Sequence, residues 1–150
     1  MVENQVDLAE ETVLVVGGEG WHQGVIGIVA SRIAERYNRP AIIISWEGEE
    51  GKGSCRSLPG FDLHEALSSN ASWLQHFGGH KLAAGLSIKR ENFCSFRRAI
   101  NAWSKEKEVG DYYQQRKQII DMELVPDEIN MALVHELKIL EPYGEQNPPP

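Results

Sequence analysis

Two runs of β-branched residues, separated by one helical repeat, constrain the fold of this chain more than any other feature. Residues 12–16 read Thr-Val-Leu-Val-Val and residues 41–46 read Ala-Ile-Ile-Ile-Ser-Trp, and short apolar runs of this kind are typical of buried strands. Between them an apolar residue recurs at every fourth position, which predicts a helix over residues 24–37 with one buried face. The residues of that face are Val25, Val29, Ile33 and Tyr37. A strand, a helix and a second strand form a βαβ unit, so we expect the two strands to be parallel.

Glycines and charged residues predict that the sheet also grows through a hairpin. Residues 48–52 are charged and rich in glycine, which is typical of a hairpin leading into a third strand over residues 53–57. Small and apolar residues predict another short strand over residues 82–88. We therefore expect an α/β fold with a mixed β-sheet and flanking helices.

Three further helices are expected beside this sheet. Asp62 lies three residues before Glu65, a spacing typical of a capped helix start. A second helical stretch is expected near residues 71–77, ended by the glycines at positions 78 and 79. The third helix is expected to carry four large residues on its inner face: Phe93, Phe96, Ile100 and Trp103.

The character of the sequence changes after residue 104. Residues 105–117 are charged and lack an apolar period, which predicts a linker. Beyond it we expect a strand over Gln118–Leu124 and a helix starting at Pro126. The apolar residues on one side of that helix are Ile129, Leu133, Leu137 and Leu140. Since no strand follows to cover them, we expect residues 118–150 to be the incomplete start of a second domain, and the chain to be a fragment.

Composition and charge exclude several classes of protein. With 150 residues, 41% hydrophobic and 25% charged, the chain has the make-up of an ordinary soluble domain, and no stretch is long and apolar enough to span a bilayer. The polar N-terminus is no secretory signal, and two distant cysteines without a CxxC suggest no disulfide framework, so we expect a cytoplasmic location. Of the net charge of −7, most falls after residue 110, so any phosphate site before it must be local.

Two glycine patterns resemble nucleotide-binding motifs, and neither fits. After Gly18 and Gly20 the next glycine is Gly24, one position too late for the dinucleotide-binding pattern GxGxxG. In residues 48–54 the first glycine is too close to the lysine, and Gly53 occupies the Ser/Thr position of a P-loop. Neither a dinucleotide site nor a P-loop is therefore expected.

No metal site is assigned from the sequence. His76 and His80 have the spacing of two helical metal ligands, but the glycines between them should break a helix. No paired Asp/Glu cluster of the kind that holds catalytic Mg²⁺ or Mn²⁺ occurs at motif spacing. A metal-dependent hydrolase complete within these residues is thus not expected.

Three glycine-rich segments are the candidates for a binding site, and we expect them to end at or near one edge of the sheet. The first contains His22 and Gly24 at a predicted helix N-terminus, where free N–H groups and the helix dipole favour an anion. Taken by itself, this segment is better interpreted as a plain strand-to-helix turn.

The second segment places an arginine between hydroxyl residues, Ser54, Arg56 and Ser57. Arginine can donate two hydrogen bonds to one phosphate and serine a third, although alone this segment could be an ordinary exposed strand. The third segment is Gly78-Gly79-His80, in which two glycines let a ligand approach the backbone next to an imidazole. By itself it could be a helix C-cap.

Together, the order and spacing of these segments resemble the RecJ family of single-strand-specific exonucleases. The resemblance rests on residues 20–32, on residues 53–57 with 59–63, and on Phe77-Gly78-Gly79-His80-Lys81-Leu82-Ala83-Ala84-Gly85. They are similar to the DHH-associated domain, which follows the catalytic DHH domain in that family. The resemblance covers residues 12–104, with residues 1–11 as the lead-in from the catalytic domain. Residues 140–148 look like the beginning of the family's OB-like DNA-binding domain.

The resemblance implies a substrate-binding fragment of a 5′-to-3′ single-stranded-DNA exonuclease of DNA repair and recombination. The Asp-His-His motif is missing from the sequence, so Mn²⁺ or Mg²⁺ and the cleavage chemistry are expected in the DHH domain, and no nuclease activity is expected of this chain alone. By likeness, His80 contacts the scissile phosphate in a supporting catalytic role. Arg56, Ser54 and Ser57 hold a neighbouring phosphate, Gly78, Gly79 and Gly24 offer backbone amides, and His22 lines the same cleft. The expected partners are single-stranded DNA and the DHH domain, with no membrane.

Two other functions stay open at this point. Related DHH phosphoesterases cleave short oligoribonucleotides or cyclic dinucleotides, although such relatives generally lack an OB-like segment. A non-catalytic binding or dimerisation module is the other alternative, because the C-terminal domain of alanyl-tRNA synthetase resembles the chain at the glycine-histidine motif.

Overall fold

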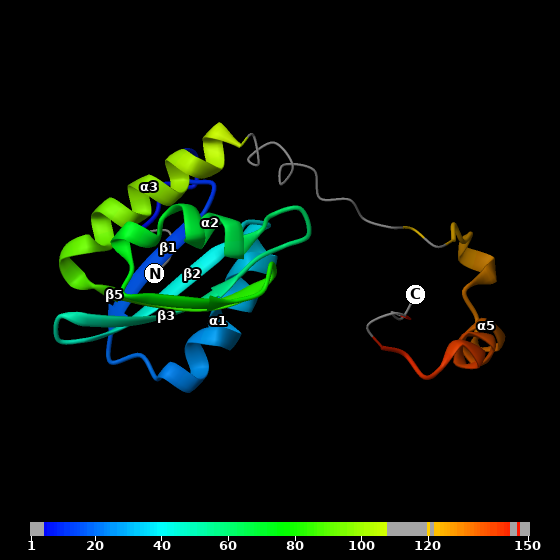
Figure 1. Cartoon of the computed structure of the whole chain (residues 1–150). Helices are drawn as coiled ribbons and strands as arrows, with labels where there is room; N and C mark the ends of the chain where they lie inside the picture. The colour runs from blue at the N-terminus through cyan, green and yellow to red at the C-terminus, as the bar shows by residue number, and fades with distance from the viewer. Residues whose placement is uncertain (1–4, 108–119, 121, 145–146, 148–150) are drawn as a thin grey trace. The chain divides into compact units, whose positions relative to one another are not determined.

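The computed structural model describes residues 5–107, 120, 122–144 and 147 (Figure 1). The chain divides into two compact units, Met1–Arg116 and Lys117–Pro150.

The first unit is built on a five-stranded mixed sheet. Its strand order is β1-β2-β3-β5-β4, and only the β1–β2 pair is parallel, with β2–β3, β3–β5 and β5–β4 antiparallel. The strands are β1 (Leu14–Glu19), β2 (Ala41–Glu47), β3 (Glu50–Arg56), β4 (His76–Gly79) and β5 (Ala83–Lys89). The predicted parallel pair, the hairpin and the α/β class with a mixed sheet are confirmed.

Helices cover both faces of this sheet (Figure 1). Helix α1 (Gln23–Tyr37) lies on one face, and α2 (Leu63–Ser69) and α3 (Phe93–Glu106) lie on the other. Because neighbouring residues of a strand point to opposite faces, the β-branched runs supply both cores. Leu14, Val16, Ala41 and Ile43 pack toward α1. Val13, Val15, Ile42 and Ile44 pack toward α2 and α3.

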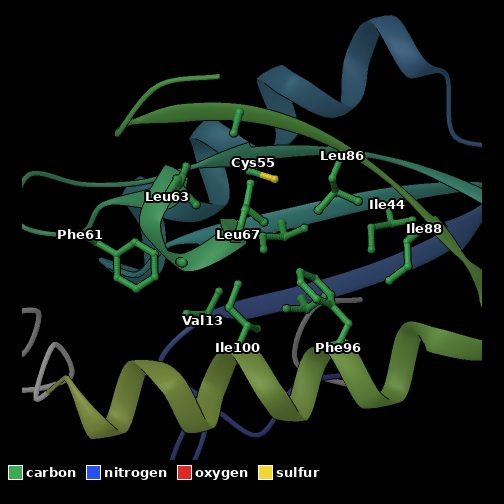
Figure 2. Close-up of a cluster of buried hydrophobic side chains, with 14 of the residues drawn as sticks. Val13, Ile44, Cys55, Phe61, Leu63, Leu67, Leu86, Ile88, Phe96 and Ile100 are labelled. Carbon is green, nitrogen blue, oxygen red and sulfur yellow. The ribbon is translucent and has the colours of Figure 1, made fainter. Parts of the chain in front are cut away.

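The core on the α2–α3 side is the larger one. Figure 2 shows Phe96 and Ile100 of α3 pointing at the sheet beside Val13 and Ile88, all fully buried. Fully burying such side chains is worth about 1.5–3 kcal/mol each. The predicted inner face of this helix is therefore confirmed for Phe96 and Ile100, whereas Phe93 and Trp103 are half-buried at its rim.

The predicted buried face of α1 is wrong for Val25 and Val29, whereas Ile33 and Tyr37 are partly buried against the core on that side of the sheet. The helix buries Ile26, Ala30 and Ala34 against the sheet, while Val25 is 49% exposed and Val29 36% exposed. Two alanines in the contact allow the helix to lie close to the strands. The valines instead line an apolar pocket of about 350 Å³ beside Trp21 and Ile33.

The predicted helix over residues 71–77 is also wrong. A single 3₁₀ turn at Ala71–Trp73 is followed by strand β4, which contains Gly78 and Gly79. Gly79 has φ +143°, and a Cβ at this position would collide with the backbone carbonyl of Ala83. The two glycines thus end an edge strand and not a helix.

The second unit contains short helical segments. A 3₁₀ turn at Pro126–Glu128 precedes helix α5 (Met131–Leu137), which is followed by a second 3₁₀ turn at Lys138–Leu140. The helix predicted from Pro126 onward therefore begins later, at Met131, because the Asn130 side chain caps it by accepting the N–H groups of residues 132 and 133. Of the predicted strand 118–124, residues 118, 119 and 121 lie outside the described residues, and the others are not in a strand.

Among the residues that the structure describes, none of the helices is sufficiently long and apolar to traverse a lipid bilayer.

Candidate anion-binding site

Strand β3 carries its polar side chains on the face that α1 covers. Ser54 pairs with Ile43 and Arg56 pairs with Ala41 in the β2–β3 register, and both partners pack toward α1. Cross-strand partners project to the same face of a sheet. Cys55, between them, points into the opposite core, where burial raises the pKa of its thiol to about 12. Ser54 and Arg56 are therefore neighbours beside α1, and Cys55 is a core residue without a thiolate near neutral pH.

Arg56 is half-buried and pairs with no acidic side chain in the part of the chain that the structure describes. Its Nη1 donates to Ser54 Oγ at 3.3 Å and to the Cys55 carbonyl at 2.8 Å. None of the ion pairs among the described residues includes Arg56. A guanidinium has five N–H donors, so these two neutral acceptors hold the group in place and leave its charge and further donors available to an anion.

Gly27 of α1 allows the helix to pass over this arginine. A Cβ built at Gly27 lies 3.3 Å from both Arg56 Nη2 and Ser54 Oγ, closer than ordinary contact. Sequence reasoning missed this residue. The available signal was the spacing of Gly24, Gly27 and Ser31, small residues that fall on one side of a helix.

The glycine–histidine segment lies at the same end of the sheet as Arg56. The His80 N–H donates to the Ala83 carbonyl at 2.7 Å, and Ala83 pairs with Arg56 across the β3–β5 ladder. One strand thus separates the two residues, which puts their backbones on the order of 10 Å apart at two strand spacings. His80 is exposed.

Two glycines form an open floor beside this end of the sheet. Gly78 of β4 pairs with Gly85 of β5, which pairs with Ser54 of β3. Both glycines are exposed, and a Cβ at Gly78 would meet nothing within 4 Å. A ligand can therefore approach the backbone at Gly78 and Gly85.

Ser57 and the first glycine-rich segment are arranged differently from the expectation. The Ser57 hydroxyl donates to the Phe61 carbonyl at 3.2 Å and so braces the turn toward α2. His22 is the N-cap of α1, and its Nδ1 accepts the Gly24 N–H at 3.1 Å. The Gly24 amide is therefore already engaged within the protein.

The expectation that all three segments meet at one edge is wrong for the first. Strand β1 ends at Glu19, opposite Trp46 near the end of β2, whereas Arg56 pairs with Ala41 at the start of β2. Because β3 runs antiparallel to β1 and β2, its last residue lies at the opposite end of the strands from the last residue of β1. Gly27 lies next to Arg56 because α1, which follows β1, packs back over β2 and β3.

The described residues do not offer a metal centre. Within residues 5–107, 120, 122–144 and 147, no three His, Cys, Asp or Glu side chains are grouped so that they could hold a metal ion.

Comparison with known proteins gives consistent matches. A family model described as the DHHA1 domain matches residues 10–106. RecJ of Bacillus subtilis, a single-stranded-DNA-specific exonuclease, is 38% identical, and the match covers 100% of this chain and 19% of that relative. RecJ of Escherichia coli is 36% identical, and the match covers 87% of this chain and 23% of that relative. The chain thus spans about a fifth of the length of these curated relatives.

Solved structures agree with the sequence matches. RecJ of Thermus thermophilus in complex with Mg²⁺ superposes with a TM-score of 0.76 at 34% identity, over 94% of this chain and 22% of that one. The C-Ala domain of Aquifex aeolicus alanyl-tRNA synthetase has a TM-score of 0.50 at 13% identity, over 69% and 91%. The second likeness shows a shared fold alone.

Proposed function

The chain belongs to the DHHA1 domain family and is a homologue of the corresponding region of RecJ exonucleases, and on that premise we propose that it is the part of a RecJ-type enzyme that binds single-stranded DNA. It grips the phosphate backbone, and hydrolysis of the phosphodiester takes place at metal ions held elsewhere in the full-length protein. The observation that carries this proposal is the Arg56 guanidinium, positioned by Ser54 beneath Gly27 and without an ion pair among the described residues.

The chemistry of the site favours a phosphate. A guanidinium donates paired hydrogen bonds to phosphate oxygens, and a hydroxyl next to it adds another donor. Such charge-assisted hydrogen bonds are about twice as strong as neutral ones. Nearby, Gly78 leaves the sheet open to a bulky backbone. We assign Arg56 and Ser54 to one phosphate, and His80 to the neighbouring scissile phosphate in a supporting role.

The remaining sequence-predicted residues take narrower roles in this proposal. Gly79 sets the backbone that presents His80, because only glycine suits its conformation. Ser57 braces the turn after β3. His22 and Gly24 fix the start of α1, and with it the height at which Gly27 crosses Arg56. They act on the phosphate through that positioning.

The same proposal covers the division of the chain into domains and the activity of the full-length enzyme. We propose that residues 12–104 are the substrate-binding domain, that residues 105–117 link it to the next one, and that residues 118–150 begin an OB-like DNA-binding domain. The full-length enzyme then digests single-stranded DNA from its 5′ end in the cytoplasm, with Mn²⁺ or Mg²⁺ in its DHH domain. Mg²⁺ and Mn²⁺ are named for solved RecJ structures.

The test is direct titration of the chain with fluorescein-labelled oligo(dT) at low salt, read by fluorescence anisotropy. Arg56→Ala is expected to weaken binding by about 1.5–3 kcal/mol, the range for hydrogen bonds to charged groups, or roughly 10- to 150-fold. Arg98→Ala is the matched control, because Arg98 is an exposed arginine of α3, on the other side of the sheet. Equal affinities of the Arg56 and Arg98 variants contradict the proposal.

One alternative keeps a specific observation in its favour. The shared fold with the alanyl-tRNA synthetase C-Ala domain is compatible with a non-catalytic binding or dimerisation module. Titration with tRNA in place of oligo(dT) separates the two functions: a clear preference for tRNA supports the module. A preference for cyclic dinucleotides or short oligoribonucleotides supports the small-substrate phosphoesterases instead.

A further inference from the structure

The face of the sheet that carries Arg56 also carries other polar side chains, arranged in rows across strands β3, β5 and β4. On β3, the residues that point to the α1 side are Lys52, Ser54 and Arg56, at every second position. The β5 partner of Lys52 is Ser87, and the β4 partner of Ser87 is His76. Lys52, Ser87 and His76 therefore form a row across three strands, parallel to the row of Ser54, Gly85 and Gly78.

Helix α1 leaves this part of the sheet accessible. The helix packs over β2 and β3, whereas Gly85, Gly78 and His76 on the outer two strands are exposed. Lys52 is exposed as well and takes part in none of the ion pairs among the described residues. The row thus combines one unpaired ammonium with an exposed imidazole, next to a floor that has no side chains.

The spacing along β3 separates the two cations by more than one phosphate. Lys52 and Arg56 are four residues apart, or about 13 Å at roughly 3.3 Å per residue. Stacked nucleotides rise about 3.4 Å per phosphate along a strand. A single strand lying on the glycine floor therefore meets Arg56 and Lys52 with different phosphates.

We propose that Lys52 and His76 form a second phosphate subsite, and that the α1-facing side of β3, β5 and β4 is a short track for a single nucleic-acid strand. The inference rests on the proposed function and extends its site. The phosphate at Arg56 and Ser54 enters at one end, the backbone crosses Gly85 and Gly78, and the next anion contact is made by Lys52 with His76.

The charges at the far end limit the length of this track. Two residues beyond Lys52 on β3 lies Glu50, which pairs with Glu47 of β2 and with Lys89 of β5. Lys89 also lies 3.8 Å from Glu91, so acidic groups predominate there and disfavour a third phosphate. Affinity for oligo(dT) is accordingly expected to rise over the first few nucleotides and then to level off.

The experiment compares Lys52→Ala with Lys105→Ala, its matched control on α3, by anisotropy titration of oligo(dT) at several salt concentrations. Loss of one exposed contact is expected to weaken binding by roughly two- to fivefold. The plot of log affinity against log salt is expected to become shallower by about 0.7, the share of one phosphate contact on a single strand. Lys52→Arg keeps the positive charge and is expected to retain the slope, and His76→Ala gives a smaller loss.

Each outcome decides between the claims. A shallower slope for Lys52→Ala, with an unchanged slope for Lys105→Ala, supports the track. If Lys52→Ala keeps the parental slope while Arg56→Ala loses affinity, the track is wrong and the proposed function stands. If neither variant differs from the parent, or if the chain binds no oligo(dT), both claims fail. Thermal melts of each variant check that the exposed substitutions leave the fold intact.

Discussion

Gly27 lowers the stability of α1 but provides the space that the proposed function needs next to Arg56. Inside a helix, glycine is less favourable than alanine by about 1 kcal/mol, yet it stands in the second turn of α1. The space that it leaves is the space next to Arg56 Nη2 and Ser54 Oγ, 3.3 Å from where a Cβ would sit. The site therefore accounts for a glycine that the helix itself does not need.

Replacing Gly27 by alanine is expected to separate the two effects. The new methyl group raises helix propensity by about 0.8–1 kcal/mol, and the flexible end of Arg56 can move by the few tenths of an ångström required. The melting temperature is thus expected to rise, while affinity for oligo(dT) falls as the guanidinium shifts. A melt and an anisotropy titration of the same variant measure both. A variant with higher stability and undiminished affinity contradicts the role given to Gly27.

For single residues, the sequence predicts contacts within one strand better than contacts between a helix and a strand. Arg56 and Ser54 are close together because they are two apart on one strand, which a sequence can reveal. The contact of Gly27 with Arg56 depends on the height and angle at which a helix crosses a sheet, and no local pattern encodes that. His22 was expected to line the cleft, and the structure shows its Nδ1 accepting the Gly24 N–H at the start of α1.

Among the elements of the first unit, two predictions fail, and they fail for separate physical causes. In α1 the four-residue period was real, but the alanines shifted by one position pack closer to the sheet than the valines. In β4, four residues with two glycines carry little strand propensity, and pairing with β5 decides the conformation. The parallel pair β1–β2 was predictable because its continuous β-branched runs leave few alternatives.

The start of α2 yields a prediction about pH. Asp62 Oδ1 accepts the Glu65 N–H at 3.0 Å, and this hydrogen bond, ahead of the nearby Lys81 charge, lowers the pKa of Asp62 below its ordinary value of 3.8. A lowered pKa means that the carboxylate stabilises the folded state above that value, and that this contribution is lost as the pH falls through the folded-state pKa.

Asp62→Ala is accordingly expected to cost about 1 kcal/mol at pH 7, the usual penalty for losing an N-cap. Asp62→Asn keeps a capping oxygen that does not titrate, so its stability is expected to change less than that of the parent between pH 5 and pH 2. Urea unfolding at several pH values measures the difference. Parallel pH profiles for the parent and Asp62→Asn rule out this explanation of the cap.

For the molecule as a whole, the prediction concerns activity. No grouping of potential metal ligands occurs among residues 5–107, 120, 122–144 and 147, and the chain spans about a fifth of its RecJ relatives. We expect the pure chain to bind single-stranded DNA without degrading it, whether Mg²⁺ or Mn²⁺ is added. Electrophoresis of a 5′-labelled oligonucleotide checks this, with Arg56→Ala as a control. Degradation that needs metal and vanishes in Arg56→Ala refutes the expectation.

The bare floor at Gly78 and Gly85 has a consequence for what can be recognised there. The peptide groups of both glycines lie in the β-ladders, so this surface offers no side-chain donors or acceptors of the kind that distinguish one base from another. A nucleic-acid strand lying on this floor is therefore recognised by its repeating phosphates and sugars and not by its bases. In the proposed site, the contacts made at this floor are therefore expected to be the same for every base sequence.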